Sequence, residues 1–232
     1  MIVIKIADIP IGIDNKFSYI TRLAKDYLTD EAPLFTVSVS DAEREKERSL
    51  DVGISDDGYL EGIVAYRKIA EELPKYDAFV FHGAVLNVEG QAYAFTAKSG
   101  VGKTTHTRLW LSEFGEKAHY LNGDKPVIRF IDGVPYAFGT PWRGKEGYGT
   151  NESAPLLAIA LLERGELNSA RTINSADAVL KLMGQIYLPK DPTAALLTMR
   201  LADRITKTVK FVELKCNMEP EAAHVAYVAL AE

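Results

Sequence analysis

Cysteine is scarce in this sequence: the 232 residues include one, Cys216. A single cysteine excludes an internal disulfide and any metal site built from several cysteines. Proteins in a reducing compartment rarely contain disulfides. The sequence therefore predicts a cytoplasmic location.

An excess of basic residues is also lacking. Lys and Arg number 27 against 32 Asp and Glu, which gives a net charge of −5, and the basic residues are scattered along the chain. Proteins that bind nucleic acids concentrate positive charge to neutralise phosphates. We therefore expect no nucleic-acid partner, and a small molecule or a protein as the substrate.

The N-terminal stretch lacks the uninterrupted apolar core of a signal peptide or membrane span. Residues 1–12 (MIVIKIADIPIG) are mostly apolar, but Lys5, Asp8 and Pro10 interrupt them and no basic region precedes them. We read the stretch as a first β-strand. No membrane partner is expected.

Repeats, low-complexity tracts and Gly/Ser-rich linkers are absent as well. Apolar residues recur at helical spacing over residues 15–28 and 58–73, on either side of the densely charged segment 39–51. From Asp77 the pattern changes to short strands. The change predicts an N-terminal α/β subdomain over residues 1–76 and a second unit over residues 77–232.

Hairpins dominate the second unit. Strands over 84–89 and 91–97 meet at Glu89-Gly90, and strands over 126–130 and 135–139 meet around Asp132-Gly133. A strand over 156–164, helices over 176–186 and 192–205, a strand over 210–215 and a helix from about residue 220 follow. Because hairpins lie directly before and after the helix that starts near residue 103, we expect an α/β fold with a mixed, largely antiparallel β-sheet flanked by helices.

Residues 94–110 (AFTAKSGVGKTTHTRLW) begin as a buried strand and end as a helix, with two glycines and a lysine between them. This is the second half of a P-loop, in which backbone N–H groups and the start of a helix hold phosphates. Ala97 stands where the full pattern has glycine, so we expect an ordinary, negative φ there. The predicted nucleotide-binding residues are Ser99, Gly100, Val101, Gly102, Lys103, Thr104 and Thr105.

Other side chains are candidates to complete the site. Asp124 follows the strand after this helix, where an acid can hold the metal of a magnesium nucleotide, although a turn-forming Asp beside Gly has the same appearance. His82 ends an apolar strand and is either a proton-transferring or a structural histidine. In the glycine-rich segment 139–153, Arg143 and Lys145 are predicted to compensate phosphoryl charge; surface solubility is the alternative explanation.

These residues resemble the catalytic domain of HPr kinase/phosphorylase and, more distantly, ATP-dependent phosphoenolpyruvate carboxykinase. The resemblance covers residues 81–110 and 121–129 and includes a His-Gly pair before a hairpin, an S-G-x-G-K-[ST] loop and a downstream acid. It implies a P-loop inserted in a mixed sheet, ATP and Mg²⁺ as cofactors, and phosphoryl transfer to a hydroxyl of a peptide, protein or small molecule. Lys103 would then hold phosphates, Thr104 and Asp124 the metal, and His82 would line the active site. The short standalone relatives of HPr kinase have a similar size.

Several features depart from that family. Gly123-Asp124 stands where HPr kinases usually have two adjacent acids, so either Asp124 serves both roles, another group is the base, or transfer is slow. Their E-[IV]-R-G-x-G stretch is not visible, and residues 1–76 do not resemble their regulatory domain, so the sequence does not favour HPr itself as the substrate. HPr kinases form hexamers, and a homo-oligomer is accordingly among the expectations. A non-catalytic ATP-binding regulator and a carboxykinase-like lyase remain the alternatives to a kinase.

Overall fold

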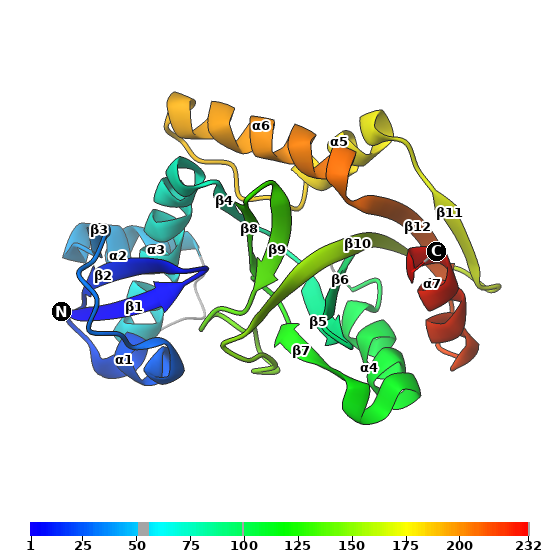
Figure 1. Cartoon of the computed structure of the whole chain (residues 1–232). Coiled ribbons are helices and arrows are strands. Elements are labelled where there is room, and N and C mark those ends of the chain that lie inside the picture. The colour runs from blue at the N-terminus through cyan, green and yellow to red at the C-terminus, as the bar shows by residue number, and fades with distance from the viewer. Residues whose placement is uncertain (51–55, 99, 232) are drawn as a thin grey trace.

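The computed structural model describes residues 1–50, 56–98 and 100–231. Over these ranges a three-stranded sheet and a nine-stranded sheet lie side by side, and helices pack around both (Figure 1). The small sheet is formed by the N-terminal residues. The strands of the large sheet come from the rest of the chain, and this sheet is curved (Figure 1). The predicted α/β class with a mixed sheet flanked by helices is confirmed.

The small sheet is formed by β1 (Ile2–Ile6), β2 (Ile9–Asp14) and β3 (Phe35–Ser38). β1 and β2 form an antiparallel hairpin, and β3 pairs with β2 in parallel. The prediction of one strand over residues 1–12 is therefore wrong. The chain turns through Ala7 and Asp8, which adopt φ values of 51° and 57° without the glycine that usually announces such a turn.

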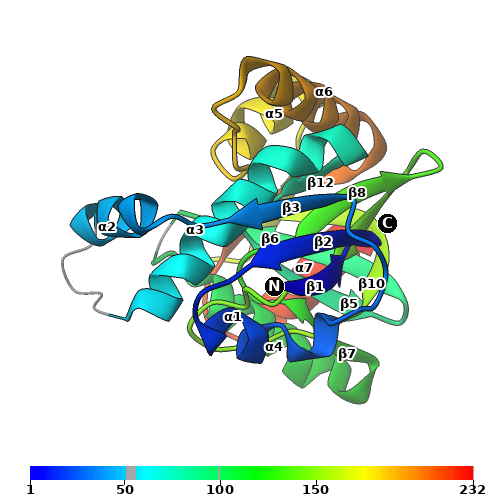
Figure 2. The same ribbon diagram turned by 90° about the vertical axis from the view of Figure 1, so that its left-hand side faces the viewer.

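The N-terminal helices are α1 (Ser18–Leu23), α2 (Asp41–Leu50) and α3 (Asp57–Glu72). α3 begins where the Asp56 carboxylate accepts a hydrogen bond from the Tyr59 N–H, a typical N-cap. Figure 2 shows α3 behind the small sheet and the charged α2 projecting from the body of the molecule. Short 3₁₀ turns follow α1 (Lys25–Tyr27) and α3 (Leu73–Tyr76).

The large sheet has the strand order β4-β8-β9-β10-β6-β5-β7, with β12 beside β10 and β11 beside β12. Of these pairs only β10 with β6 and β10 with β12 are parallel, so the predicted largely antiparallel sheet is confirmed. Both predicted turns adopt positive φ, at Glu89-Gly90 and Asp132-Gly133. The strands are β4 (Ala78–Val80), β5 (Ala84–Val88), β6 (Gln91–Thr96), β7 (Ala118–Asn122), β8 (Val127–Ile131), β9 (Val134–Phe138), β10 (Ser153–Arg164), β11 (Ser169–Thr172) and β12 (Lys210–Cys216).

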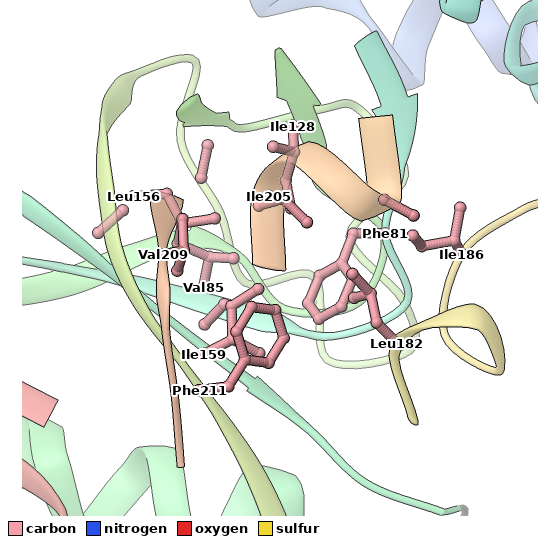
Figure 3. Packing of buried hydrophobic residues seen from close by; sticks show 14 of the residues in the cluster. Phe81, Val85, Ile128, Leu156, Ile159, Leu182, Ile186, Ile205, Val209 and Phe211 are labelled. Carbon is pink, nitrogen blue, oxygen red and sulfur yellow. The ribbon is translucent and has the colours of Figure 1, made fainter. Parts of the chain in front are cut away.

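Helices cover both faces of the large sheet. Along β6, Ala92 and Ala94 face α5 (Ser175–Met183) and α6 (Pro192–Thr208), whereas Tyr93 and Phe95 face α4 (Lys103–Phe114) and α7 (Glu221–Ala231). α5 ends three residues earlier than predicted and α6 ends later. Figure 3 shows the first of these cores, in which side chains from β5, β8, β10 and β12 meet those of α5 and α6.

A third apolar core joins the N-terminal region to one edge of the large sheet. It combines isoleucines of β1 and β2 with Ile69 of α3 and with Val80, Val127 and Phe138 from β4, β8 and β9. The predicted boundary between residues 76 and 77 falls between the second 3₁₀ turn and β4, and the division into domains stays a prediction. Within the described ranges, no helix has the length and apolar character needed to cross a membrane.

Candidate functional site

A glycine-rich loop connects β6 to α4. Its two glycines adopt φ values of 78° at Gly100 and 120° at Gly102, which other residues rarely adopt. Ala97 has no positive φ, as expected from the sequence. Ser99 lies outside the described residues. Arg164, at the end of β10, donates hydrogen bonds to the carbonyls of Gly100 and Val101 and so fixes the far side of the loop.

The start of α4 presents backbone donors to a large pocket. Gly102 is the N-cap residue, and neither a capping side chain nor an acid is found in the first turn. The unpaired N–H groups and the positive end of the helix dipole favour an anion at this place. The loop and the first turn, including Thr104 and Thr105, line a pocket of about 830 Å³, within the size range of small-molecule sites. We call it the large pocket.

Lys103 lies at the first position of α4 and points across the large pocket. Its side chain is 18% exposed, and its Nζ is 3.9 Å from Asp124 Oδ1. Burial lowers the pKa of Lys103, while the charge of Asp124 acts in the opposite direction. A lysine held in this way contributes a directed positive charge to the pocket.

Asp124 is held by the turn after β7. The Asn122 side-chain oxygen accepts hydrogen bonds from the N–H groups of Asp124 and Lys125, at 2.8 and 2.7 Å. Asp124 lies 2.7 Å from Lys125 Nζ and 3.4 Å from His82 Nε2. Burial alone would raise the pKa of Asp124, but hydrogen bonds with His82 and Lys125 and the charges of the two lysines hold it well below its usual range.

His82 is positioned from its backbone. Its N–H donates to the Gln185 carbonyl at 2.7 Å, and its carbonyl accepts a hydrogen bond from the Thr96 hydroxyl at 2.9 Å. The imidazole is half exposed and lies at the border of the large pocket beside Asp124. The structure thus brings Lys103, Asp124 and His82 together.

The segment 139–153 reaches the same pocket. Arg143 and Lys145 both line it, but the Arg143 guanidinium also lies 3.7 Å from Asp26 and packs 5.8 Å from the centre of the Tyr27 ring. Lys145 is exposed. Arg143 is therefore anchored to the N-terminal region, and Lys145 is the freer cation of the pair.

Sequence reasoning missed several parts of the pocket. Lys125 forms the shortest contact with Asp124, and a Cβ at Gly144 would lie 2.8 Å from the Asp124 Cβ. Tyr19 and Tyr59 contribute walls from the N-terminal region. Lys125 directly follows Asp124 in the chain, so its contact with Asp124 could have been predicted from the sequence. The other contacts join segments that are far apart in sequence, and no local sequence pattern indicates them.

Position 123 has little room for the second acid of HPr kinases. A Cβ on Gly123 would lie 3.3 Å from the Tyr148 carbonyl oxygen and 3.4 Å from that of Arg143. The Gly123 N–H also donates to the Tyr148 carbonyl at 2.9 Å. The segment 143–148 therefore occupies the space that a side chain at position 123 would need.

The donor set fits a magnesium nucleotide better than a metal ion alone. Among the residues that the structure describes, no group of three or more His, Cys, Asp or Glu side chains could hold a metal. Mg²⁺ is commonly bound by one or two carboxylates together with substrate phosphates and water. Asp124 and Thr104 both line the large pocket beside the uncapped start of α4, so the residues present fit a metal ion that is carried by a nucleotide.

Comparison with known proteins adds little to this geometry. No family model and no curated protein sequence matches the chain. Among solved structures, the HPr(Ser) kinase/phosphatase from Coxiella burnetii is similar to 53% of this chain and 92% of its own, at 13% identity and a TM-score of 0.32. Similarity at that level carries no functional argument, so the P-loop and carboxykinase-like details of the fold stay predictions.

Proposed function

We propose that the protein is an ATP-dependent phosphotransferase that moves the γ-phosphoryl group to a hydroxyl of a peptide, protein or small molecule. One observation carries the proposal. The glycine-rich loop and the uncapped start of α4 face a pocket in which Lys103 and Asp124 converge to 3.9 Å. In phosphoryl transfer the protein mainly positions the reactants and compensates the negative charge on the phosphoryl group, and these groups can do both.

Each residue has a distinct role in this proposal. Backbone N–H groups of residues 102–104 and the Lys103 ammonium bind the β- and γ-phosphates, and Lys145 adds positive charge at the rim. Thr104 and Asp124 would hold Mg²⁺, which supplies further compensation of the charge that develops on the phosphates. Through its contact with Asp26, Arg143 orients the segment 143–148, in which Gly144 packs against Asp124.

His82 is the better proton acceptor in this arrangement. The acceptor oxygen forms a bond to the γ-phosphorus, and the bond from phosphorus to the bridging oxygen breaks with its electron pair going to ADP. The hydroxyl proton passes to Nδ1 of His82, because Nε2 faces Asp124. Hydrogen bonds with His82 and Lys125 and the charges of Lys125 and Lys103 hold the pKa of Asp124 low, so the carboxylate is a weak base and stays ionised, as a metal ligand must be. Imidazole accepts protons near neutral pH.

An ATP-binding regulator without useful transfer is the second candidate. It is favoured by the missing second acid and by the tight space at Gly123. Because a side chain there would press on segment 143–148, a Gly123→Asp variant tests tolerance of the backbone as well as catalysis. Turnover by the natural chain distinguishes the candidates more cleanly. No observation in the described residues favours the carboxykinase-like reaction.

The test is turnover of γ-labelled ATP with Mg²⁺ by the natural chain and by Lys103→Met. The matched control is Lys207→Met, which changes an exposed lysine on α6, paired with Asp203 and away from the large pocket. We expect the Lys103 variant to lose turnover and the control to keep it. Equal turnover in the natural chain and Lys103→Met would overturn the proposal.

A further inference from the structure

A second pocket of about 450 Å³ adjoins the large pocket. It lies between α3, β4 and the segment 184–187, which runs beside β4 through the pairing of Ile186 with Phe81. Figure 3 shows Phe81, Leu182 and Ile186 close together. The two pockets share Ile63, His82, Lys125 and Trp142 as walls. We call it the apolar pocket.

The aromatic walls of the apolar pocket use their polar atoms within the protein. The Tyr66 hydroxyl donates to the Lys125 carbonyl at 2.7 Å, the Trp142 indole N–H to the Gly62 carbonyl at 3.0 Å, and the Tyr187 hydroxyl to Glu71 at 2.6 Å. Trp142 also stacks on Tyr66, with ring centres 4.2 Å apart. These side chains therefore offer carbon surface to a ligand.

The charged groups of this pocket are also paired. Arg67 donates two hydrogen bonds to Glu47, and Lys125 is bound to Asp124. An occupant with a net charge would have to break one of these pairs or remain unpaired at a cost. The pocket is therefore matched to an uncharged, apolar group.

We propose that the apolar pocket binds the phosphate acceptor, and that the acceptor carries an aliphatic or aromatic group next to its hydroxyl. The inference rests on the proposed function. His82 lines both pockets, so a hydroxyl held at their border lies beside His82 and faces the glycine-rich loop across the large pocket. The volume suits one side chain of a peptide or a small aromatic alcohol, and either source supplies the same chemistry.

Gly184 offers a way to narrow the apolar pocket. It caps the end of α5 with a φ of −74°, and an added Cβ would meet only the Lys181 carbonyl oxygen, at 3.6 Å. A larger side chain there causes no backbone strain. Gly184→Trp adds a large side chain at a residue that lines the apolar pocket, and Gly184→Ala is the matched control. Thermal unfolding of both variants shows whether they keep the fold.

The experiment offers γ-labelled ATP with N-acetyl-Ser-Xaa-amides in which Xaa is Leu, Phe, Glu or Lys, and with benzyl alcohol and glycerol as small-molecule arms. Binding of each acceptor is followed in parallel by ligand-observed NMR. We expect the Leu, Phe or benzyl compounds to exceed their charged or polar counterparts by about tenfold or more in binding or kcat/KM. Gly184→Trp should remove that advantage, while Gly184→Ala keeps it.

The outcomes separate the two proposals. If MgATP binds but apolar acceptors have no advantage, or Gly184→Trp leaves the advantage intact, this inference is wrong and the phosphotransferase proposal stands. If Gly184→Trp weakens binding of ATP but not of tripolyphosphate, the pocket holds the base of the nucleotide, which also overturns the inference. Failure of the natural chain to bind MgATP overturns the proposed function itself.

Discussion

Lys103 and Asp124 converge from two different elements, the start of α4 and the turn after β7, to 3.9 Å between Nζ and Oδ1. The two residues are distant in sequence, so only the fold brings them together. β5 lies between β6 and β7 and is antiparallel to both, so the C-terminal ends of β6 and β7 lie on the same side of the sheet. Lys103 follows β6 and Asp124 follows β7, and both side chains therefore reach one pocket.

Asp124→Asn should uncouple nucleotide binding from magnesium. The variant keeps the shape of the side chain but loses the charge that would hold the metal, so turnover should fall at least about 100-fold. Affinity for metal-free ATP should rise, because Lys103 and Lys125 lose their common anionic partner. Turnover assays measure the first effect, and calorimetric titrations of ATP with Mg²⁺ and with EDTA measure the second. An unchanged magnesium dependence would contradict the role of Asp124.

His82→Asn should slow transfer without weakening the nucleotide. Loss of a general base typically costs about 100-fold or more in kcat. The exposed His119, which pairs with Glu152 outside the pocket, provides the control His119→Asn. Steady-state kinetics and the Kd for MgATP are measured for both variants. If His82→Asn changes the Kd and leaves kcat intact, His82 has a binding role instead.

Gly144→Ala should displace Asp124. Gly144 has a φ of 73° and its added Cβ would lie 2.8 Å from the Asp124 Cβ. Gly147 in the same loop has a φ of 70° with nothing within 4 Å of an added Cβ, so Gly147→Ala carries only the backbone cost of about 1 kcal/mol. We expect lower turnover for Gly144→Ala than for Gly147→Ala. Equal turnover in the two variants would show that the contact with Asp124 has no effect.

His106 should make stability depend on pH. It is 2% exposed on α4, its Nε2 accepts a hydrogen bond from the Trp110 indole N–H, and burial lowers its pKa to about 4. Because the unfolded chain binds the proton near pH 6.5, the folded state loses stability as the pH falls from 6.5 toward 4. Between pH 7 and pH 5 the loss attributable to His106 is about 2 kcal/mol.

The check for His106 is urea unfolding of the natural chain and of His106→Gln at both pH values. Glutamine can accept the Trp110 hydrogen bond but does not titrate in this range. The difference in unfolding free energy between the two proteins should change by about that amount between pH 7 and pH 5. A difference that does not change with pH would show that His106 is protonated in the folded state.

The sequence predicted those parts of the fold that depend on local signals. The hairpins at Glu89-Gly90 and Asp132-Gly133 each contain a glycine, which readily adopts the positive φ that such turns need, and the structure confirms both hairpins. The turn at Ala7-Asp8 contains no glycine, and the β1–β2 hairpin was therefore missed.

The candidate site divides in the same way. Gly100, Gly102 and Lys103 follow one another in the chain, so their arrangement could be predicted from their order. The stacking of Trp142 on Tyr66 and the contact of Arg143 with Asp26 join segments far apart in sequence, and only the packing of the N-terminal region against the large sheet determines them. Roles in chemistry that were assigned to these residues stay predictions until they are measured.

Calorimetric titration of MgATP into the natural chain, with tripolyphosphate as a competitor, tests the central claim most directly. The account predicts binding with a Kd of about 1 mM or tighter, displacement by tripolyphosphate, and loss of the signal in Lys103→Met. Absence of binding at millimolar MgATP, or equal binding by Lys103→Met, would contradict it.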